Sequence, residues 1–381
     1  MKHHQPGYIL LITFSMLALC TALVSMFLAK GLTHKKFTTI VLEREKMNQF
    51  IVSTPALAQS FLSFSADDIK PAEKAATDDA TDKAAPTEGA DNFEKKLLEK
   101  VLPVVNKTQS FKMKEIDKDF PVVINLTFFC ESGKININGL YDLVNKNFYN
   151  EGIAGKDQKV FATWLFDKIA KITEKPSLLQ PFIEHVKQRK LPFNDVTELL
   201  AIKEFAICFS DAVFYESQQP NASSDKKNQK LFLTDIFTVT SESDTIQPWL
   251  LSPSVCVLLD IAQQSSKQEE QKKEEDKKVD TSSFKLQADW KKDWDTGLKP
   301  LYNVSFDKIP EQIRGMLSTQ FSVTTFSILV QVAREVVEDS SFAKASADTE
   351  NNMAVRMFAI LKQNKLSDNS ITYDVIKIYQ V

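Results

Sequence analysis

Nucleophilic catalysis and zinc binding both rely on histidine and cysteine, and this chain has few of either. It has four histidines and four cysteines in 381 residues, and no Cys-x-x-Cys pair. His3, His4 and His34 flank an apolar run near the amino terminus, which leaves His185 alone in the rest of the sequence. Ser-His-Asp or Cys-His catalysis and multi-histidine metal sites therefore have almost no residues from which to form. We expect His185 to be a surface residue of a helix, and the protein not to be an enzyme.

The cysteines do not form a disulfide framework. Cys20 lies inside the apolar run, and Cys130, Cys208 and Cys256 stand in the apolar contexts TFFCE, FAICF and PSVCV. An odd number of cysteines in such contexts favours buried thiols over disulfide bonds. The sequence therefore predicts three buried free thiols outside the apolar run.

One acidic stretch, DWKKDWDTG, has oxygen ligands close enough in sequence to hold calcium on a loop. Its carboxylates are Asp289, Asp293 and Asp295. The stretch matches no twelve-residue calcium loop and carries two lysines. In the alternative interpretation Trp290 and Trp294 lie one helical turn apart and pack against the core. Both interpretations stay open, and we expect no other metal or cofactor.

Composition sets wider limits. The net charge is −3 from 47 basic and 50 acidic residues, and no basic stretch is interleaved with aromatic residues. We therefore expect no nucleic acid partner. Nine glycines leave little room for a phosphate-binding loop. The length suffices for one large or two modest domains with a buried core.

An uncharged run near the amino terminus is long enough to cross a membrane. Residues 8–29 carry no charge, and as a helix they would span about 33 Å against about 30 Å of hydrocarbon. The run is too long for the core of a secretory signal, and Phe27 stands where cleavage before Lys30 would need a small residue. Leu19 similarly stands where a lipoprotein signal before Cys20 would need a small residue. We expect a retained membrane helix.

The apolar pattern continues at helical spacing beyond this run. From Phe37 onward, apolar residues recur at Phe37, Ile40, Val41, Met47, Phe50 and Ile51. Ser53-Thr54-Pro55 has the form of a helix cap with proline in the first turn, so we expect a bend or a restart there. A membrane helix that runs on as an amphipathic stem, here residues 8–65, has the shape of a pilin-type subunit. The alternative is a signal anchor with a juxtamembrane helix.

Three segments are too polar to bury enough surface to fold. Residues 66–92 consist mainly of Ala, Asp, Thr, Lys and Pro, residues 263–283 contain a run of charges, and residues 340–352 interrupt two apolar segments. We expect a disordered linker at 66–92, a charged linker at 263–283, and a long loop tip at 340–352.

Strands and helices alternate between these segments. Residues 120–129 (FPVVINLTFF) and the following INING predict a hairpin or a pair of strands. Residues 141–262 look mainly helical, in the stretches LYDLVNKNF, VFATWLFDKIAKI, SLLQPFIEHVKQ and DVTELLAIKEF. Residues 321–332, 354–361 and 371–379 predict three successive antiparallel strands, preceded by a short helix in PEQIRGMLST. The fold class is therefore α+β.

The expected architecture is a long membrane and stem helix followed by a β-rich head in two parts. The head comprises residues 93–140 and 284–381, and an α-helical insertion of residues 141–262 splits it. We expect Asn136 and Asn138, which alternate with isoleucines at the junction, to satisfy turn backbone and not to bind a ligand.

The amino terminus resembles a prepilin peptidase site. Gly7 precedes the uninterrupted apolar run, so that residues 1–7 would be a leader and cleavage would fall between Gly7 and Tyr8. Most pilins and pseudopilins carry a glutamate five residues into the mature chain, whereas Ile12 stands there here. General secretion pathway protein K, a minor pseudopilin of type II secretion, also lacks this acid. A carboxylate in lipid is costly unless a neighbouring charge offsets it.

Further segments resemble protein K in their order along the chain. They are GKININGL at 133–140 before the insertion, LPFNDVTELLAI at 191–202, Phe237–Val239 with IQPWLLSPSVCVL at 246–258 closing the insertion, and the strand at 321–332. Asp195 and Glu198 have the spacing of a helix-capping box. Gln247 replaces an expected asparagine, and the acidic-tryptophan segment usual in the insertion is missing. The chain thus resembles a distant member of this family.

The resemblance implies a pilin-like antiparallel head and a place at the tip of a secretion pseudopilus. It implies maturation and N-methylation by a prepilin peptidase, assembly with minor pseudopilins I and J, and contact with the outer-membrane secretin or secreted substrates. The face that binds other pseudopilins would be Phe37, Ile40, Val41, Met47, Phe50 and Ile51. Relatives bind calcium in the head, although their ligands have no residue-by-residue match here.

The implied location is the bacterial inner membrane, with a single pass and the head in the periplasm. The positive-inside rule favours the opposite orientation, because Lys30, Lys35 and Lys36 follow the helix while the leader offers Lys2. Two other functions stay open: a membrane-anchored periplasmic or surface binding protein, and a minor pilin of a type IV pilus.

Overall fold

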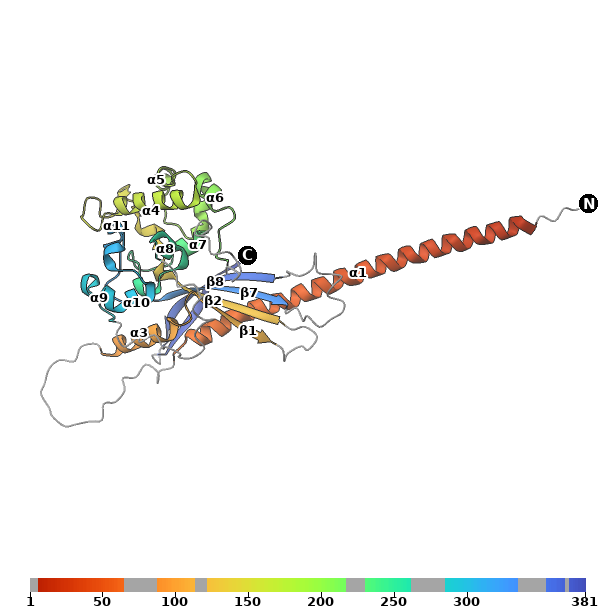
Figure 1. Cartoon of the computed structure of the whole chain (residues 1–381), viewed down its shortest axis with the longest axis horizontal. Coiled ribbons are helices and arrows are strands. Elements are labelled where there is room, and N and C mark those ends of the chain that lie inside the picture. The colour runs from red at the N-terminus through yellow and green to blue at the C-terminus, as the bar shows by residue number, and fades with distance from the viewer. Residues whose placement is uncertain are drawn as a thin grey trace, which may run out of the picture.

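One helix of 57 residues dominates the shape of the molecule (Figure 1). The computed structural model describes residues 6–64, 88–113, 122–216, 230–261, 285–334, 354–366 and 370–381. Helix α1 runs from Pro6 to Leu62 without a break, so the restart expected as one of two outcomes at Ser53-Thr54-Pro55 is wrong. The hydroxyls of Ser53 and Thr54 both donate to the carbonyl of Phe50, at 2.8 Å, and therefore do not cap a new helix. Pro55 removes one hydrogen bond from α1, and burial of the neighbouring turns keeps the helix continuous.

The head is built on a five-stranded antiparallel sheet of order β1-β2-β7-β8-β9. Its strands are β1 (Thr108–Met113), β2 (Val122–Cys130), β7 (Thr325–Arg334), β8 (Ala354–Lys365) and β9 (Ile371–Gln380). The three predicted carboxyl-terminal strands are confirmed. The predicted pairing of residues 120–129 with INING is wrong, because β2 pairs with β1 on one side and with β7 on the other.

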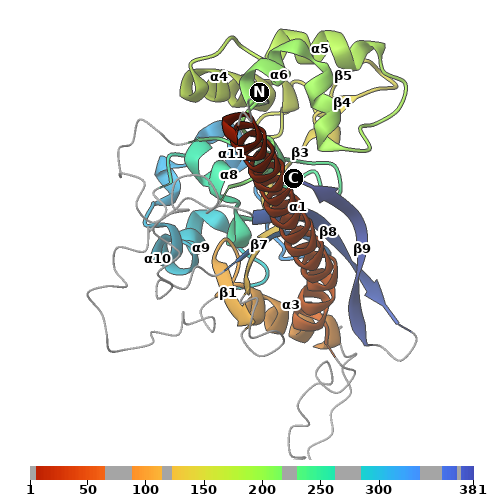
Figure 2. The same cartoon turned by 90° about the vertical axis from the view of Figure 1, so that its right-hand side faces the viewer.

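The carboxyl-terminal part of α1 covers one face of this sheet. Met47, Ile51, Ala58 and Leu62 are at most 1% exposed. The rings of Phe61 and Phe128, on α1 and β2, lie 5.3 Å apart. Figure 2 looks along α1 and shows β8 and β9 beside it. The sheet therefore holds the last third of α1 and leaves the first part without contact.

Helix α3 (Glu88–Val101) packs near the end of α1. Phe93 on α3 contacts Phe64, with ring centroids 5.2 Å apart, and the ammonium group of Lys100 lies 4.4 Å from the centre of the Phe64 ring. The linker expected at 66–92 therefore ends earlier, at the start of α3. Residues 66–87 of that linker lie outside the described residues, as do all of 263–283 and all of 340–352.

The predicted helical insertion enters between β2 and β7. Its helices are α4 (Gln158–Thr173), α5 (Leu179–Gln188), η3 (Val196–Ala201), α6 (Lys203–Phe209), α7 (Leu233–Ile236), η5 (Pro248–Leu250) and α8 (Pro253–Leu258). They lie on the side of the head away from the protruding half of α1 (Figure 1). Two short strands, β3 (Ile135–Asn136) and β6 (Phe237–Thr238), pair in parallel and join the two ends of the insertion.

The helix expected in LYDLVNKNF is wrong. This stretch forms a hairpin of β4 (Tyr141–Asp142) and β5 (Asn147–Phe148). The Asp142 carboxylate accepts hydrogen bonds from the backbone N–H groups of Val144 and Asn145, at 2.8 and 3.1 Å. Such local bonds stabilise a turn and outweigh the helical spacing of the apolar residues.

Residues 285–324 are helical and irregular, and they pack on the insertion. Their helices are α9 (Trp290–Gly297), α10 (Lys299–Tyr302), η8 (Phe306–Lys308) and α11 (Glu311–Arg314), the last being the short helix predicted in PEQIRGMLST. The rings of Trp290 and of Trp249 in η5 lie 4.8 Å apart. The fold class is the predicted one: a long helix, an antiparallel sheet and a helical insertion.

Candidate functional site

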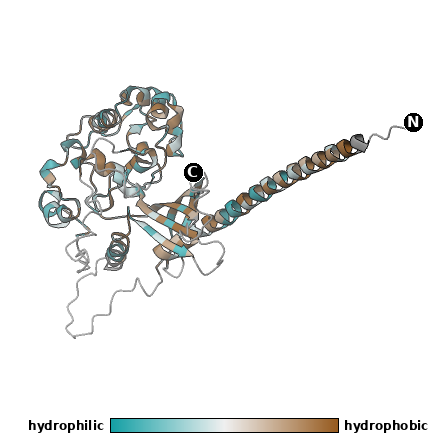
Figure 3. Ribbon diagram, turned by 45° about the vertical axis from the view of Figure 1, so that its right-hand side comes forward, coloured by the Kyte–Doolittle hydropathy of each residue, from teal (hydrophilic) through white to brown (hydrophobic). Residues whose placement is uncertain are grey.

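The first half of α1 presents a long apolar surface to the surroundings. Of the residues that the structure describes, one helix is long and apolar enough to cross a membrane, and it is α1. Figure 3 shows the apolar amino-terminal half of the helix projecting from the head. Gly7 and Tyr8 lie in the first turn of this helix.

Several hydroxyls in the projecting half have partners within the helix. Thr21 donates to the carbonyl of Leu17 at 3.0 Å, Ser25 to that of Thr21 at 2.8 Å, and Thr33 to that of Ala29 at 2.9 Å. Such bonds satisfy these three hydroxyls without water. A helix with this pattern can lie in lipid or against other apolar helices.

The six stem residues expected to bind partners fall into two groups. Phe37, Ile40 and Val41 are 66%, 38% and 47% exposed, so they remain accessible to another chain. Met47 and Ile51 are each 1% exposed and Phe50 is half-buried, because the chain's own sheet covers this part of α1. The partner role of Met47 and Ile51 is therefore corrected to a role in the head's own core.

A buried ion pair lies where β2 leads into the insertion. Glu131 is the first residue of η1 (Glu131–Gly133), and Lys134 follows its last residue. The two side chains form an ion pair, and the residues are 3% and 2% exposed. The Lys134 ammonium also donates to the Ser327 hydroxyl on β7, at 3.0 Å. Thr238 and Thr240 donate to the other Glu131 oxygen, at 2.5 and 3.3 Å. Buried charges are stable only when they are paired and hydrogen-bonded in this way. Because the partners are Ser327 on β7 and two threonines of the insertion, the cluster also joins the sheet to the insertion.

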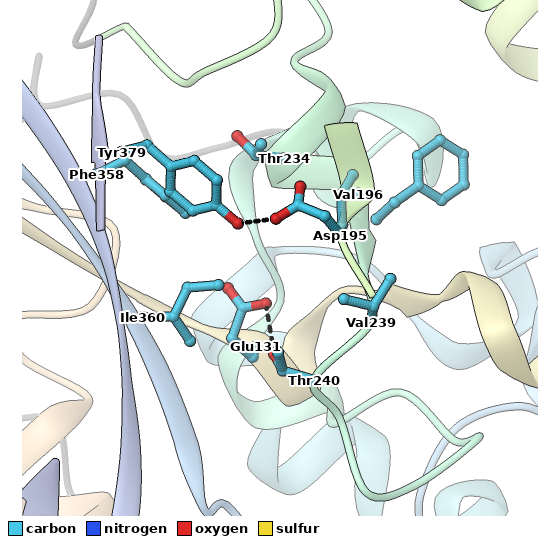
Figure 4. A pocket seen from close by; sticks show the side chains of 10 residues that line it. Glu131, Asp195, Val196, Thr234, Val239, Thr240, Phe358, Ile360 and Tyr379 are labelled. Carbon is cyan, nitrogen blue, oxygen red and sulfur yellow. Dashed lines mark hydrogen bonds between the residues drawn. The ribbon is translucent and has the colours of Figure 1, made fainter. Parts of the chain in front are cut away.

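Asp195 forms a second junction between insertion and sheet (Figure 4). It caps η3, and the capping box with Glu198 predicted from the sequence is confirmed. Its carboxylate also accepts hydrogen bonds from Tyr379 and, at 3.2 Å, from Lys377, both on β9. Burial raises the pKa of Asp195, but the hydrogen bonds from Tyr379 and Thr197 and the charge of Lys377 outweigh it, so that the pKa lies below its usual value.

The cavity between these junctions is too small for a substrate. It has a volume of about 20 Å³, and Glu131, Asp195, Thr240 and Tyr379 are among the residues that line it (Figure 4). A space of this size holds about one water molecule. The polar cluster is therefore a structural joint and does not form a catalytic cleft.

Residues 289–297 do not form the calcium loop that was one of their two interpretations. The stretch is helix α9, which Asp289 caps by accepting the Lys291 N–H. Asp293 pairs with Lys285 at 2.9 Å, and its other oxygen accepts the Asp289 N–H. Asp295 lies 3.8 Å from Lys299. Among the described residues no group of three or more histidine, cysteine or acidic side chains could hold a metal.

The alternative interpretation of this stretch is confirmed. Trp290 and Trp294 are 6% and 1% exposed, and their indole N–H groups donate to the carbonyls of Ser318 and Val304, at 3.0 and 2.7 Å. Helical periodicity therefore places both rings in the core, while the carboxylates of Asp289, Asp293 and Asp295 pair with lysines.

The two junction asparagines bind backbone, as expected. The Asn138 amide donates to the Phe193 carbonyl at 2.9 Å and accepts the Phe193 N–H at 2.8 Å. Asn136 caps η2 (Ile137–Gly139) and donates to the Ser241 carbonyl at 3.1 Å. These contacts fasten two loops of the insertion, at Phe193 and Ser241, to the junction.

The predicted thiols are free cysteines; Cys130 and Cys256 are buried, and Cys208 is half-buried. Burial raises the pKa of the Cys130 thiol to about 12 and also raises that of Cys256, so neither is a reactive nucleophile. His185 lies on α5 as expected, but it is half-buried and stacks on Phe193. Burial and the charge of Arg189 both lower its pKa.

Sequence reasoning missed the Glu131–Lys134 pair and the links from β9 to Asp195. A signal for the first was present: an acid and a base three residues apart directly after a buried strand, in ESGK. Nothing local indicates the second, because Asp195 and Tyr379 are 184 residues apart.

Comparisons with known proteins find similarity in structure but no match in sequence. No family model matches the chain, and no curated protein matches its sequence. Among solved structures, the chain is similar to a chain of the GspK-GspI-GspJ complex from the type 2 secretion system of enterotoxigenic Escherichia coli. The two are 12% identical, the match covers 90% of this chain and 99% of that chain, and the TM-score is 0.42. The sequence motifs described above resemble protein K of the same secretion system.

Proposed function

We propose that this protein is a minor pseudopilin that caps the tip of a type II secretion pseudopilus. A prepilin peptidase would cleave after Gly7, and the apolar part of α1 would then pack among the helices of sister subunits. The protein would act by assembly and not by catalysis. The ordered set of motifs that resembles protein K supports this proposal.

One observation carries the argument for the tip. The projecting half of α1 leaves the head on one side, and the insertion fills the other side (Figure 1). In a fibre, subunits stack along the axis of the bundled helices. A subunit added above would have to run its own stem past the space that the insertion occupies. A head of this form therefore fits best where no subunit follows.

The exposed stem residues would provide the contact with minor pseudopilins I and J. Phe37, Ile40 and Val41 lie between the apolar run and the part of α1 that the sheet covers. Burial of exposed apolar side chains stabilises association by roughly 25 cal/mol per Å². Contact with the secretin or with secreted substrates would involve the head, on the periplasmic side of the inner membrane.

Labelling of assembled fibres tests the tip position. The chain, with a small epitope tag after Val381, would be expressed with the pseudopilins of its own system and stained with gold-labelled antibody. We expect one label at one end of each fibre. Labels at regular intervals along the fibre would contradict the tip role.

A second candidate function is a membrane-anchored binding protein outside any fibre. The three lysines after the apolar run, Lys30, Lys35 and Lys36, favour it, because they favour the orientation opposite to that of a pseudopilin. Under this alternative the same labelling shows gold on the membrane and none on fibres. A minor pilin of a type IV pilus would place the label on surface pili.

A further inference from the structure

A second cavity lies in the insertion, beside the contact of Asn138 with Phe193 described above. It has a volume of about 180 Å³ and lies between the β4–β5 hairpin and the loop that follows α5. Its lining includes Tyr141, Leu143, Val144, Val186, Pro192 and Phe193. Pockets for drug-sized ligands have volumes of about 300–1,000 Å³. A space of this smaller size fits one large apolar side chain of a protein partner.

The walls of this cavity are held rigid by hydrogen bonds. Asn138 fixes the backbone of Phe193 in both directions, and the Lys146 ammonium on the hairpin donates to the Arg189 carbonyl at 2.9 Å. The Arg189 guanidinium lies 4.1 Å from the centre of the Phe193 ring and donates to the Leu191 carbonyl at 3.2 Å. A preformed site loses little conformational entropy when a partner binds.

Exposed apolar residues surround the opening. Val144, at the hairpin turn, is 88% exposed, and Leu191, in the opposite loop, is 70% exposed. The described part of the chain leaves most of the surface of Val144 and Leu191 uncovered. An apolar rim around a cavity for one side chain is the form of a protein-binding hot spot.

A buried hydroxyl in the wall has no partner. Tyr141 is 4% exposed, and its hydroxyl forms no hydrogen bond with any described residue. Leaving a buried polar group unpaired costs about 1–3 kcal/mol. A ligand that brings a hydrogen-bonding group would remove this cost, so the hydroxyl points to an occupant that is not wholly apolar.

The charges at the opening favour an anionic partner. Lys190 lines the cavity, and Lys146 lies in the turn of the hairpin that forms one wall. Neither forms an ion pair with the residues that the structure describes. The one acidic residue in the lining, Asp142, already accepts hydrogen bonds from the backbone of Val144 and from the backbone and side chain of Asn145. A carboxylate on the partner would therefore bind beside the two lysines.

We infer that this cavity binds a segment of a partner protein that inserts one aromatic or large aliphatic side chain and places an adjacent carboxylate between Lys146 and Lys190. The inference goes beyond the proposed function. It rests on the insertion alone and holds whether or not the chain is processed at Gly7.

Binding of short peptides to the full chain in lipid nanodiscs tests the inference. The probe is a capped, dye-labelled hexapeptide with a central Phe-Asp pair flanked by Gly and Ser, measured by fluorescence anisotropy. We expect saturable binding with a Kd below about 1 mM. Replacing Phe by Ser, or Asp by Lys, in the probe is expected to weaken binding at least tenfold.

Variants of the chain locate the site. Val144→Ser and Lys190→Glu, both at exposed positions, are expected to weaken binding of the Phe-Asp probe at least fivefold. The matched controls Val160→Ser and Lys203→Glu, exposed on α4 and α6, should leave it unchanged. Tyr141→Phe should keep the unfolding temperature at or above that of the parent chain while it lowers affinity severalfold.

Three results would overturn the inference. The first is equal binding of the Phe-Asp probe and its Ser or Lys versions, and the second is absence of saturable binding up to several millimolar. The third is a self-association of the chain, seen by sedimentation, that Val144→Ser abolishes, because the occupant would then be a second copy of the same chain.

Discussion

The hydroxyl of Tyr379, on the last strand of the sheet, donates a hydrogen bond to the carboxylate of Asp195, the residue that caps η3 in the insertion. Lys377 on the same strand reaches the same carboxylate. Asp195 therefore has two tasks: it satisfies the N–H of Thr197 at the start of η3, and it joins the insertion to β9. The position of the insertion on the head depends on this contact.

The Asp195 junction should weaken in acid. Its folded pKa lies below the ordinary value, so its contribution to stability is fully present above about pH 4 and is lost as the pH falls through the folded pKa. Tyr379→Phe removes one hydrogen bond to a charged group, worth about 1.5–3 kcal/mol. Asp195→Asn should remove part of the loss of stability in acid, measured by urea unfolding between pH 7 and pH 3. Asp307→Asn, on the surface of η8, is the control; an equal effect from it would contradict the assignment.

The buried Glu131–Lys134 pair should show the cost of a lone buried charge. Glu131→Gln or Lys134→Met is expected to lower the free energy of unfolding by about 3–5 kcal/mol, since each leaves the partner uncompensated. The double variant should lose less than the sum of the two single variants. Lys159→Met breaks an exposed pair with Glu151 and should leave the unfolding midpoint near that of the parent chain. Strictly additive losses in the double variant would show that the two charges do not interact.

Gly133 should not tolerate a side chain. A Cβ atom there would lie 1.8 Å from the carbonyl oxygen of Leu250, which is backbone of η5. Gly133→Ala must therefore separate the end of β2 from the insertion, at a cost of about 1–3 kcal/mol or more. Gly297→Ala is the matched control, because no atom lies within 4 Å of its Cβ. Thermal unfolding compares the two; a Gly133→Ala chain as stable as the parent would contradict this close approach.

Helix α9 should be indifferent to calcium. The Asp289 carboxylate caps the helix, and the Asp293 carboxylate binds Lys285 and the Asp289 N–H. The two carboxylates therefore do not form a shared calcium site. Asp293→Asn is expected to lower the unfolding temperature equally with calcium and with a chelator, because it loses the charge that pairs with Lys285 and one of the two acceptor oxygens. Differential scanning calorimetry measures this. A calcium-dependent rise in the unfolding temperature that Asp293→Asn abolishes would restore the loop interpretation.

Local signals in the sequence predicted most of the fold. The apolar run and its helical continuation predicted α1, β-branched alternation predicted β7, β8 and β9, and the Asp195–Glu198 spacing predicted the start of η3. Each of these patterns reports on residues that are close together in the chain. The prediction of a helix in LYDLVNKNF failed because the Asp142 side chain stabilises a turn there, although the apolar residues have helical spacing.

Contacts between distant residues could not be predicted. Strand β1 escaped notice because TQSFKM is a mostly exposed edge strand without a clear alternation. The parallel pairing of β3 with β6 joins residues about a hundred positions apart, and neither strand is longer than two residues. The covering of Met47 and Ile51 by the sheet likewise depends on where α1 docks, which the helical pattern alone does not indicate.

The mass of the mature amino terminus tests the central claim most directly. The full chain would be expressed with a prepilin peptidase, purified from membranes and digested, and its amino-terminal peptide analysed by mass spectrometry. We predict a chain that begins at Tyr8 and carries an N-methyl group, and a Gly7→Val variant that keeps residues 1–7. A parent chain that retains its leader in the presence of active peptidase would contradict the claim that this protein is a pseudopilin.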